Sequence, residues 1–359
     1  MFKINQIKVN LNLDIWNRIG FDQGMNSEVY TARDPQLNQV LILKKITKKS
    51  LIKQDIEDFF LESKILNESR HPLIMPIFYA GEDKDHILIT MPYYENGSLE
   101  SLMDKRFLTT REIIKFALDF LTGLLFMHTK NILHLDIKPT NIILNDNNRA
   151  LLTDFGLSRF TNDDGLIKQK MQYSSHRSPE SYESLERTIL DDIYQAGITL
   201  YRMCNGNVNF KEQFKKLNLT SSDMNDLIKR RKKGEFPKKE YLPHIPLKLE
   251  RIINKAIHPN PNNRHQSVLN MINELCKVDG TLDWFYSYNK RDGTHQWKCN
   301  NQTSIITLLI KYNNGVFLTS GTKYAKNSKK TSNLTPPKGQ FDNLRAAFKY
   351  VQRMLENYS

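Results

Sequence analysis

The stretch His134-Leu135-Asp136-Ile137-Lys138-Pro139-Thr140-Asn141 decides the fold, and Asp154-Phe155-Gly156 follows it a short distance along the chain. It lies between an apolar helical pattern, Ile113 to His128, and the strand-like Ile142-Ile143-Leu144. This context places a base, a cation and two oxygen ligands on one tight loop. A single Asp or Asn is more often a solvated turn residue, but the joint spacing Asp-x-Lys-x-x-Asn, then Asp-Phe-Gly, is hard to obtain by chance.

The composition is that of a globular protein with more than one unit. The 359 residues exceed the roughly 150 that a single domain usually needs, and 39% hydrophobic and 10% aromatic residues can fill cores. Lys3 and Lys8 interrupt the first residues, so we expect no signal peptide. The cysteines are far apart and fit neither a disulfide framework nor a zinc site: Cys204, Cys276 and Cys299. We therefore expect a cytoplasmic protein. We also expect no membrane span, because the longest apolar stretches, such as Ile305 to Ile310, fall far short of the roughly 20 residues that a membrane helix needs.

Much of the net charge of +13 is carried by the last 80 residues, Gly280 to Ser359. They contain 12 Lys and Arg against 4 Asp and Glu, a net charge of +8. Such a field attracts nucleic acid, an acidic protein or an anionic membrane surface. A Lys- and Asn-rich surface that reflects coding bias is an equally good interpretation.

The chain before Ser98 reads as a strand-rich unit. The helix expected there carries Glu62 among apolar residues, where an unpaired carboxylate would be costly to bury. We expect Lys44, on the preceding strand, to be its partner. The turn before the second strand holds Gly24, which alone is a weak phosphate-loop signal. Strands are expected at 13–19, 28–32, 40–46, 74–79 and 87–91, with the helix at 55–68.

From Ser98 onward the apolar spacing is mainly helical. Residues 205–246 read as a looser, basic region, and the run Lys229-Arg230-Arg231-Lys232-Lys233 within it is typical of a solvated helix face. Helices are expected at 99–103, 111–128, 189–204, 222–229, 247–257 and 266–275.

Residues from about Leu13 to Cys276 resemble a eukaryotic-type Ser/Thr protein kinase, of the kind also found in bacteria. The intervals from Lys44 to Glu62, from Asp136 to Asn141 and from Asn141 to Asp154 agree with the family pattern. The resemblance implies an α+β, bilobal protein-kinase-like fold. Its implied parts are a lead-in at 1–12, a β-rich lobe at 13–91 and a helical lobe at 92–277.

The resemblance also implies the reaction, transfer of the γ-phosphate of ATP to a protein hydroxyl, which depends on positioning and charge neutralisation. Asp136 resembles the aspartate that accepts the proton of the substrate hydroxyl. Lys138 would lie beside the transferred phosphate, and a Lys here is the Ser/Thr-kinase pattern. Asn141 and Asp154 supply hard oxygen ligands that suit Mg²⁺, with Mn²⁺ as the alternative ion.

The resemblance places most of the ATP contacts in the first lobe. Lys44 would contact the α- and β-phosphates and be held by Glu62. Apolar residues around the adenine ring would equally fit a plain core, and only the flanking motifs favour the ligand. The remaining positions are Gly24 in the glycine loop, Val29 and Ile42 above the ring, Ile143 below it, Met91 at the gatekeeper position, and backbone groups of Pro92 and Tyr94.

Three further elements separate protein kinases from small-molecule phosphotransferases. Ser178-Pro179-Glu180 resembles the Ala-Pro-Glu motif. Asp192 stands at the buried helix start of the helical lobe. Arg264 resembles the arginine that pairs with the glutamate of the motif, here Glu180.

Two departures from the family pattern favour an alternative function. The glycine positions of the loop align to Asp22, Gly24 and Ser27, so only the middle one is kept. Ile42 replaces the usual small residue above the adenine. A pseudokinase scaffold that binds nucleotide or a partner without catalysis is therefore the alternative to the enzyme.

Leu135 stands where many kinases have an arginine that is neutralised by a phosphate on the activation loop. We therefore expect activity that depends little on phosphorylation of that loop, the non-RD type. The hydroxyls that remain candidate phosphorylation sites are Ser158, Thr161, Tyr173, Ser174 and Ser175.

Residues 278–359 form an accessory domain that resembles no family we recognise. Strands at 282–286, 304–311 and 315–320, a basic loop and a helix at 342–357 predict a small α+β module packed on one side of its sheet. We expect it to dock a substrate or partner protein. The alternative is a nucleic-acid sensor that regulates the kinase, because aromatic residues interleaved with Lys and Arg can stack bases. Such residues more often form a core with a solvated rim; they are Trp284, Phe285, Tyr286, Tyr288 and Trp297.

Overall fold

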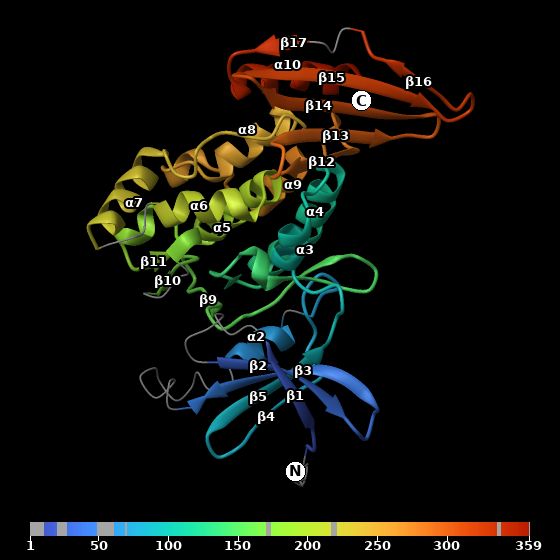
Figure 1. Ribbon diagram of the computed structural model, residues 1–359. Helices are drawn as coiled ribbons and strands as arrows, with labels where there is room; N and C mark the ends of the chain where they lie inside the picture. Colours follow the sequence, from blue (N-terminus) through green and yellow to red (C-terminus); the bar gives the residue numbers. More distant parts are fainter. Residues whose placement is uncertain are drawn as a thin grey trace, which may run out of the picture. The chain divides into compact units, whose positions relative to one another are not determined.

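The computed structural model describes residues 11–19, 27–48, 61–68, 70–169, 174–216, 221–335 and 339–358 (Figure 1). The chain divides into two compact units, Met1–Glu95 and Asn96–Ser359. Within the described part of the chain, every helix is too short or too polar to cross a bilayer.

The first unit is a five-stranded antiparallel sheet in the order β1-β2-β3-β5-β4, with one described helix (Figure 1). The strand expected at 74–79 is misplaced, because Pro76 has no N–H for a ladder and pairing begins only where Phe78 donates to Thr90. Residues 55–60 of the expected helix lie outside the described ranges. The elements are β1 Asp14–Ile19, β2 Ser27–Asp34, β3 Gln39–Thr47, α2 Leu61–Glu68, β4 Tyr79–Glu82 and β5 His86–Pro92.

The second unit begins with a helical part built around α5, Ile189–Asn205, whose side chains are almost all buried. Capping boxes start α4 at Thr109 and α5 at Thr188. Helix α6 was not expected, because only Asn207 and Phe210 of its residues are buried and no apolar stripe marks it. The other helices are α3 Leu99–Lys105, α4 Thr110–Thr129, α6 Asn207–Lys216, α7 Ser221–Lys233, α8 Leu247–Ala256 and α9 Val268–Leu275.

Short strands and 3₁₀ turns connect these helices. Three two-stranded antiparallel ladders join β6 to β9, β7 to β8 and β10 to β11. The strands are β6 Ile132–Leu133, β7 Ile142–Leu144, β8 Ala150–Leu152, β9 Arg159–Phe160, β10 Ile167–Lys168 and β11 Glu186–Arg187. The 3₁₀ turns are η2 Pro139–Asn141, η3 Ser174–His176, η4 Glu180–Tyr182 and η5 Pro261–Asn263.

The C-terminal part of the second unit is a six-stranded antiparallel sheet with helix α10 on one face, so the expected one-sided module is confirmed (Figure 1). Asn314 and Gly315, both with positive φ, form the two-residue turn between β14 and β15. Strands β13, β16 and β17 were not expected, because β17 is very short and the residues of β13 and β16 are mostly polar. The elements are β12 Trp284–Asn289, β13 Thr294–Asn300, β14 Ser304–Asn313, β15 Val316–Ala325, β16 Lys330–Asn333, β17 Gly339–Phe341 and α10 Leu344–Asn357.

The aromatic residues of this module are mostly core. Trp284, Tyr286 and Trp297 are buried in the cluster between the sheet and α10, so they are not available to stack on a base. Phe285 and Tyr288 are exposed. The expectation that such residues form a core with a solvated rim is therefore confirmed, and the alternative in which they stack bases is wrong for the three buried rings.

The C-terminal module is attached to the helical part through α4 and the loop before α8. The carbonyl oxygen of His244 accepts hydrogen bonds from Thr110 (3.1 Å) and Thr281 (2.8 Å). Arg111 pairs with Asp283 at 2.6 Å, and the ring of Tyr286 stacks on that of His244 with 5.7 Å between centroids. These contacts join the first residues of the module to the start of α4 and to the loop before α8.

Candidate active site

Helix α5 fixes the backbone of the loop that the sequence singles out. The Asp192 carboxylate accepts hydrogen bonds from the N–H groups of His134 (2.9 Å) and Leu135 (2.7 Å). Gln195, one helical turn further, accepts from the N–H of Ile137 (2.8 Å) and donates to the carbonyl of Leu135 (2.9 Å). Side chains three residues apart lie on the same face of a helix, so α5 presents both to the loop.

Leu135 itself has a left-handed backbone, with a φ of 63°, and its side chain is fully buried. This conformation costs a residue with a Cβ about 1–2 kcal/mol. The hydrogen bonds from Asp192 and Gln195 hold the residue there. Buried hydrogen bonds to Asp192 and Gln195 therefore hold the loop at Leu135, a residue whose side chain carries no charge.

The two carboxylate oxygens of Asp136 differ in their hydrogen bonding. Its Oδ2 accepts hydrogen bonds from Nζ of Lys138 (2.9 Å) and Nδ2 of Asn141 (2.8 Å). Its Oδ1 is buried and has no hydrogen-bond partner among the described residues. A buried carboxylate oxygen without a donor is costly. This Oδ1 atom is therefore suited to accept a hydrogen bond from a substrate hydroxyl.

Burial raises the pKa of Asp136 to about 6, an effect that the neighbouring Asp154 reinforces and that Lys138 and Asn141 oppose. The carboxylate is therefore mostly ionised at neutral pH. A base with a pKa close to the working pH combines the correct protonation state with a useful proton affinity.

Asn141 and Asp154 fit a metal ion that other ligands help to bind. Both offer oxygen ligands, and Asp154 lies close enough to Asp136 to raise its pKa. No group of three or more His, Cys, Asp and Glu residues that could hold a metal occurs among the described residues. Mg²⁺ is commonly bound by one or two carboxylates together with substrate phosphates, so this pair fits Mg²⁺ held partly by a nucleotide.

The first unit brings four of the predicted ATP-binding residues onto one face of its sheet. Val29 pairs directly with Lys44, and Ile42 pairs with Met91. Residues directly opposite each other in an antiparallel ladder point to the same side, as do residues two apart on a strand. Lys44 is 6% exposed, so its side chain is buried on this face of the sheet.

The other predicted ATP-binding residues are described in part. Pro92 ends β5 and Ile143 lies on β7 in the second unit. Tyr94 is half-buried in the segment that follows β5. Gly24 and Asp22 lie outside the described residues. Glu62 lies in α2, and its side chain is outside the described part, so its predicted pairing with Lys44 stays a prediction.

The segment after Asp154 is anchored by main-chain and hydroxyl contacts. Strand β9 pairs with β6, and β10 pairs with β11. Ser158 is fully buried and donates its hydroxyl hydrogen to the carbonyl of His134 (3.1 Å). Ser175 is also buried, whereas Thr161 is half-buried. In this conformation Ser158 and Ser175 are inaccessible to a modifying enzyme; Tyr173 and the side chain of Ser174 lie outside the described residues.

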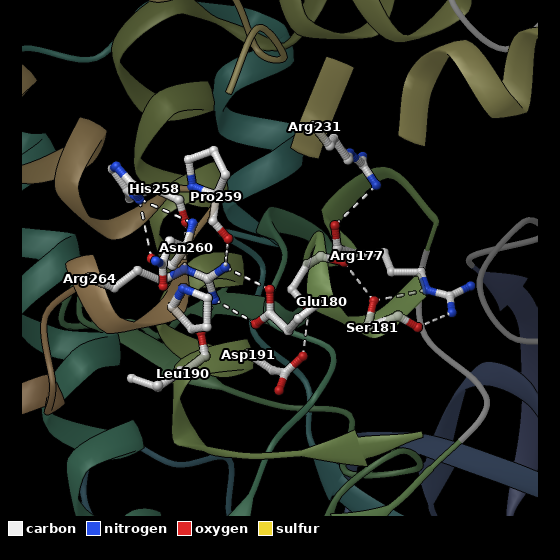
Figure 2. Close-up of polar contacts among 12 residues, drawn as sticks. Arg177, Glu180, Ser181, Leu190, Asp191, Arg231, His258, Pro259, Asn260 and Arg264 are labelled. Carbon is white, nitrogen blue, oxygen red and sulfur yellow. Dashed lines mark hydrogen bonds and ion pairs between the residues drawn. The ribbon is translucent and has the colours of Figure 1, made fainter. Parts of the chain in front are cut away.

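Figure 2 shows the ion pair between Arg264 and Glu180, which the resemblance led us to expect. Two guanidinium nitrogens of Arg264 donate to the two oxygens of Glu180, each at 2.7 Å. The arginine side chain is fully buried. Ser178, in the same motif, is fully buried and donates to Asp191. The bidentate pair fixes the start of η4 against the loop before α9.

Three buried residues of this region were not singled out from the sequence. Gln195 holds the loop, as described above. His176 donates from Nδ1 to the carbonyl of Ile137 (2.9 Å), and burial together with Arg202 lowers its pKa well below the usual value. Arg231 is 1% exposed, so the interpretation of run 229–233 as a solvated face is wrong for it. Polar residues at helical spacing within the apolar pattern of α5 were the available signal for Gln195.

Comparisons with known proteins match most of the chain to one family. A family model described as the protein kinase domain matches residues 15–278. The chain is 27% identical over 303 residues to the serine/threonine-protein kinase PknD of Protochlamydia amoebophila, covering 73% of this chain and 30% of that protein. It is 28% identical over 261 residues to a probable serine/threonine-protein kinase of Clostridium acetobutylicum, covering 71% and 38%.

A eukaryotic relative is similar at the same level. The chain is 29% identical over 244 residues to an Aurora kinase of Eremothecium gossypii, covering 67% of this chain and 63% of that protein. The chain therefore spans less than two thirds of the length of each of these three relatives.

Proposed function

The chain belongs to the protein kinase domain family, and we propose that it is an active kinase that transfers the γ-phosphate of ATP to Ser and Thr hydroxyls of a protein. The observation that carries the proposal is how the two oxygens of the Asp136 carboxylate are hydrogen-bonded. One carboxylate oxygen is fixed by Lys138 and Asn141, and the other is buried without a partner among the described residues.

In this proposal Oδ1 of Asp136 accepts the proton of the substrate hydroxyl as the hydroxyl oxygen bonds to the γ-phosphorus. The bond from that phosphorus to the oxygen of ADP breaks, and ADP leaves. Lys138 offsets negative charge on the transferred group. Mg²⁺, when bound, neutralises phosphate charge, and Asn141 and Asp154 are the residues that would hold it.

Lys138 and the names of the relatives support Ser and Thr as acceptors. In this family a Lys two residues after the base is the Ser/Thr pattern. All three relatives described above are named as kinases, and two are named serine/threonine-protein kinases. We place the reaction in the cytoplasm, where ATP is available.

We further propose that activity depends little on phosphorylation of the activation loop. Leu135 is neutral and buried, so a loop phosphate has no arginine partner at this position. The β10–β11 ladder and the hydroxyl of Ser158 hold the loop through contacts that need no phosphate. These contacts do the ordering that a phosphate does in other kinases.

We propose that residues 278–359 act as a docking module for a protein partner. Their sheet and α10 share one core, and the module is attached to α4 and His244. The burial of Trp284, Tyr286 and Trp297 removes support from the nucleic-acid alternative.

The rival is a pseudokinase, which Ile42 and Asp22 favour. Ile42 faces the same side of the sheet as Lys44, where a large side chain narrows a nucleotide site. The test is incubation with γ-labelled ATP, Mg²⁺ and dephosphorylated casein, followed by phosphoamino-acid analysis. Label on serine or threonine, absent with Asp136→Ala, supports the kinase. Equal label with both proteins, or label on tyrosine alone, contradicts it.

A further inference from the structure

A hollow of about 550 Å³ lies beside the end of α7, next to the Ser178-Pro179-Glu180 motif. We name it the basic groove. The charged and titratable residues that line it are Glu180, Glu183, Lys232, Lys233, Lys239 and His258. It lies entirely within the second unit, and Figure 2 shows its wall at Glu180, His258 and Asn260.

The carboxylates of the basic groove are already neutralised. Both oxygens of Glu180 are bound by the buried guanidinium of Arg264. Glu183 pairs with Lys232 at 2.6 Å. The groove therefore adds no free negative charge to the surface.

Two lysines of the basic groove are not engaged in an ion pair within the described part of the chain. Lys233 and Lys239 are exposed and form no ion pair with any described residue. The ammonium of Lys239 lies over Gly234, 3.8 Å from the position that a Cβ on that glycine would occupy. Gly234 has a φ of 70°, so a turn that only glycine adopts readily brings the two lysines to one hollow. The result is a local surplus of positive charge.

The groove is rigidly connected to the activation segment through Arg231. This buried side chain donates to the carbonyl oxygens of Ser175 (2.6 Å) and Arg177 (3.1 Å) and to the hydroxyl of Tyr182 (2.7 Å). Lys232 and Lys233 follow it directly on α7. A chain held by these lysines would thus lie at a fixed place relative to the backbone of the activation segment.

We propose that the basic groove binds an acidic segment of the protein substrate, a run of Asp or Glu residues separate from the phosphorylated hydroxyl. The proposal rests on the proposed kinase function and deepens it. Complementary charge raises association rates and selects partners more than it raises affinity. The lining of the groove contains no Phe, Tyr or Trp, the large rings on which bases stack best, which favours an acidic peptide over a nucleic acid.

The test measures fluorescence anisotropy of a labelled peptide with six consecutive glutamates and uncharged flanks, titrated with the full chain at low salt. Lys233→Glu with Lys239→Glu should weaken binding by about tenfold or more, because attraction becomes repulsion. The matched control is Lys84→Glu with Lys105→Glu, which changes the charge equally at two exposed lysines outside both the basic groove and residues 278–359. It should leave the affinity within about twofold.

A third variant should act in the opposite direction. Glu183→Gln releases Lys232 from its ion pair, so it should tighten peptide binding by about twofold to threefold. Loss of affinity in this variant would contradict the charge assignment.

Equal weakening by the groove variant and the Lys84→Glu with Lys105→Glu variant would overturn the proposal, because net charge would then explain the binding. Tighter groove-dependent binding of a labelled twelve-residue oligothymidylate than of the peptide would overturn it in favour of nucleic acid. Peptide binding needs no ATP, so the two proposals fail separately. Groove-dependent binding without phosphate transfer contradicts only the kinase, and phosphate transfer with groove-independent binding contradicts only the groove.

Discussion

Nζ of Lys138 donates a hydrogen bond to Oδ2 of Asp136 at 2.9 Å, in a loop where both side chains are almost fully buried. The same oxygen accepts from Asn141, so Oδ1 is the atom left for a substrate. The lysine thereby orients the proposed base and lowers its pKa against the effect of burial.

Replacing Lys138 with Ala should lower the rate of phosphate transfer by about a hundredfold. The change removes the cation beside the transferred group and releases one of the two donors that orient Asp136. Initial rates with saturating ATP and casein measure the effect. Lys105 is exposed at the end of α3, and Lys105→Ala should keep the wild-type rate. An equal loss of rate in both variants would contradict the role assigned to Lys138.

Gln195→Ala should reduce the free energy of unfolding by about 2–4 kcal/mol, because it leaves the buried N–H of Ile137 and carbonyl of Leu135 without this partner. Urea unfolding followed by circular dichroism measures the change. Gln340→Ala, at an exposed position of β17, should change stability by less than about 0.5 kcal/mol. A Gln195→Ala variant as stable as wild type would show that α5 does not hold the loop.

Removing four of the five candidate hydroxyls of the activation segment should leave activity within about threefold of wild type. The variant combines Thr161→Ala, Tyr173→Phe, Ser174→Ala and Ser175→Ala. It keeps Ser158, whose hydroxyl bonds to His134. Abolished transfer would contradict independence from loop phosphorylation.

Disrupting the β10–β11 ladder of the activation segment should lower the rate of phosphate transfer more than removing the hydroxyls does. The N–H of Gln169 donates to the carbonyl of Leu185 at 2.9 Å, next to the β10–β11 pair. Gln169→Pro removes this donor. We expect transfer to fall about tenfold or more, as measured with casein, and an unchanged rate would mean that the ladder does not order the loop.

Stability should fall with acid through His244, whose ring is fully buried and stacks on Tyr286 of the C-terminal module. Burial lowers its pKa to about 4, below the usual value of 6.5. The unfolded chain therefore binds the proton more readily, and stability present above pH 6.5 is lost as the pH falls toward 4. At pH 5 the cost is about 2 kcal/mol.

His244→Phe keeps a ring against Tyr286 and removes the titrating group, so its free energy of unfolding should fall less between pH 7 and pH 5 than that of wild type. Urea unfolding at the two pH values gives the difference. His295, buried to a lesser degree and with its pKa lowered to about 4, remains in both proteins. An equal decrease in both proteins would contradict the prediction for His244.

The central loop and several helices could be predicted because their signals are local, whereas the bilobal fold was implied by the resemblance to protein kinases. The spacing of Asp136, Lys138 and Asn141 follows from chemistry on one short turn, and periodic apolar residues predicted α4 and α5. Pro76 explains why a strand expected from its apolar residues begins only later. Helix α6 and strand β13 carry too little apolar periodicity to be predicted.

Contacts between distant segments were not predictable in the same way. His176 and Arg231 gain their roles from backbone oxygens far away in sequence, at Ile137 and at Ser175. A run of five basic residues looks solvated because nothing in the run marks which one turns inward. Trp284 and Trp297 likewise could be core or surface until the sheet and α10 are seen together.

The central claim is that Asp136 acts as the base in phosphate transfer. Its most direct test is the rate of γ-phosphate transfer to casein by wild type and by Asp136→Asn, with ATP affinity measured on both proteins. Asparagine keeps the size of the side chain but cannot accept the hydroxyl proton. We predict a rate about 10²–10⁴-fold lower at unchanged ATP affinity. Equal rates in the two proteins would contradict the assignment.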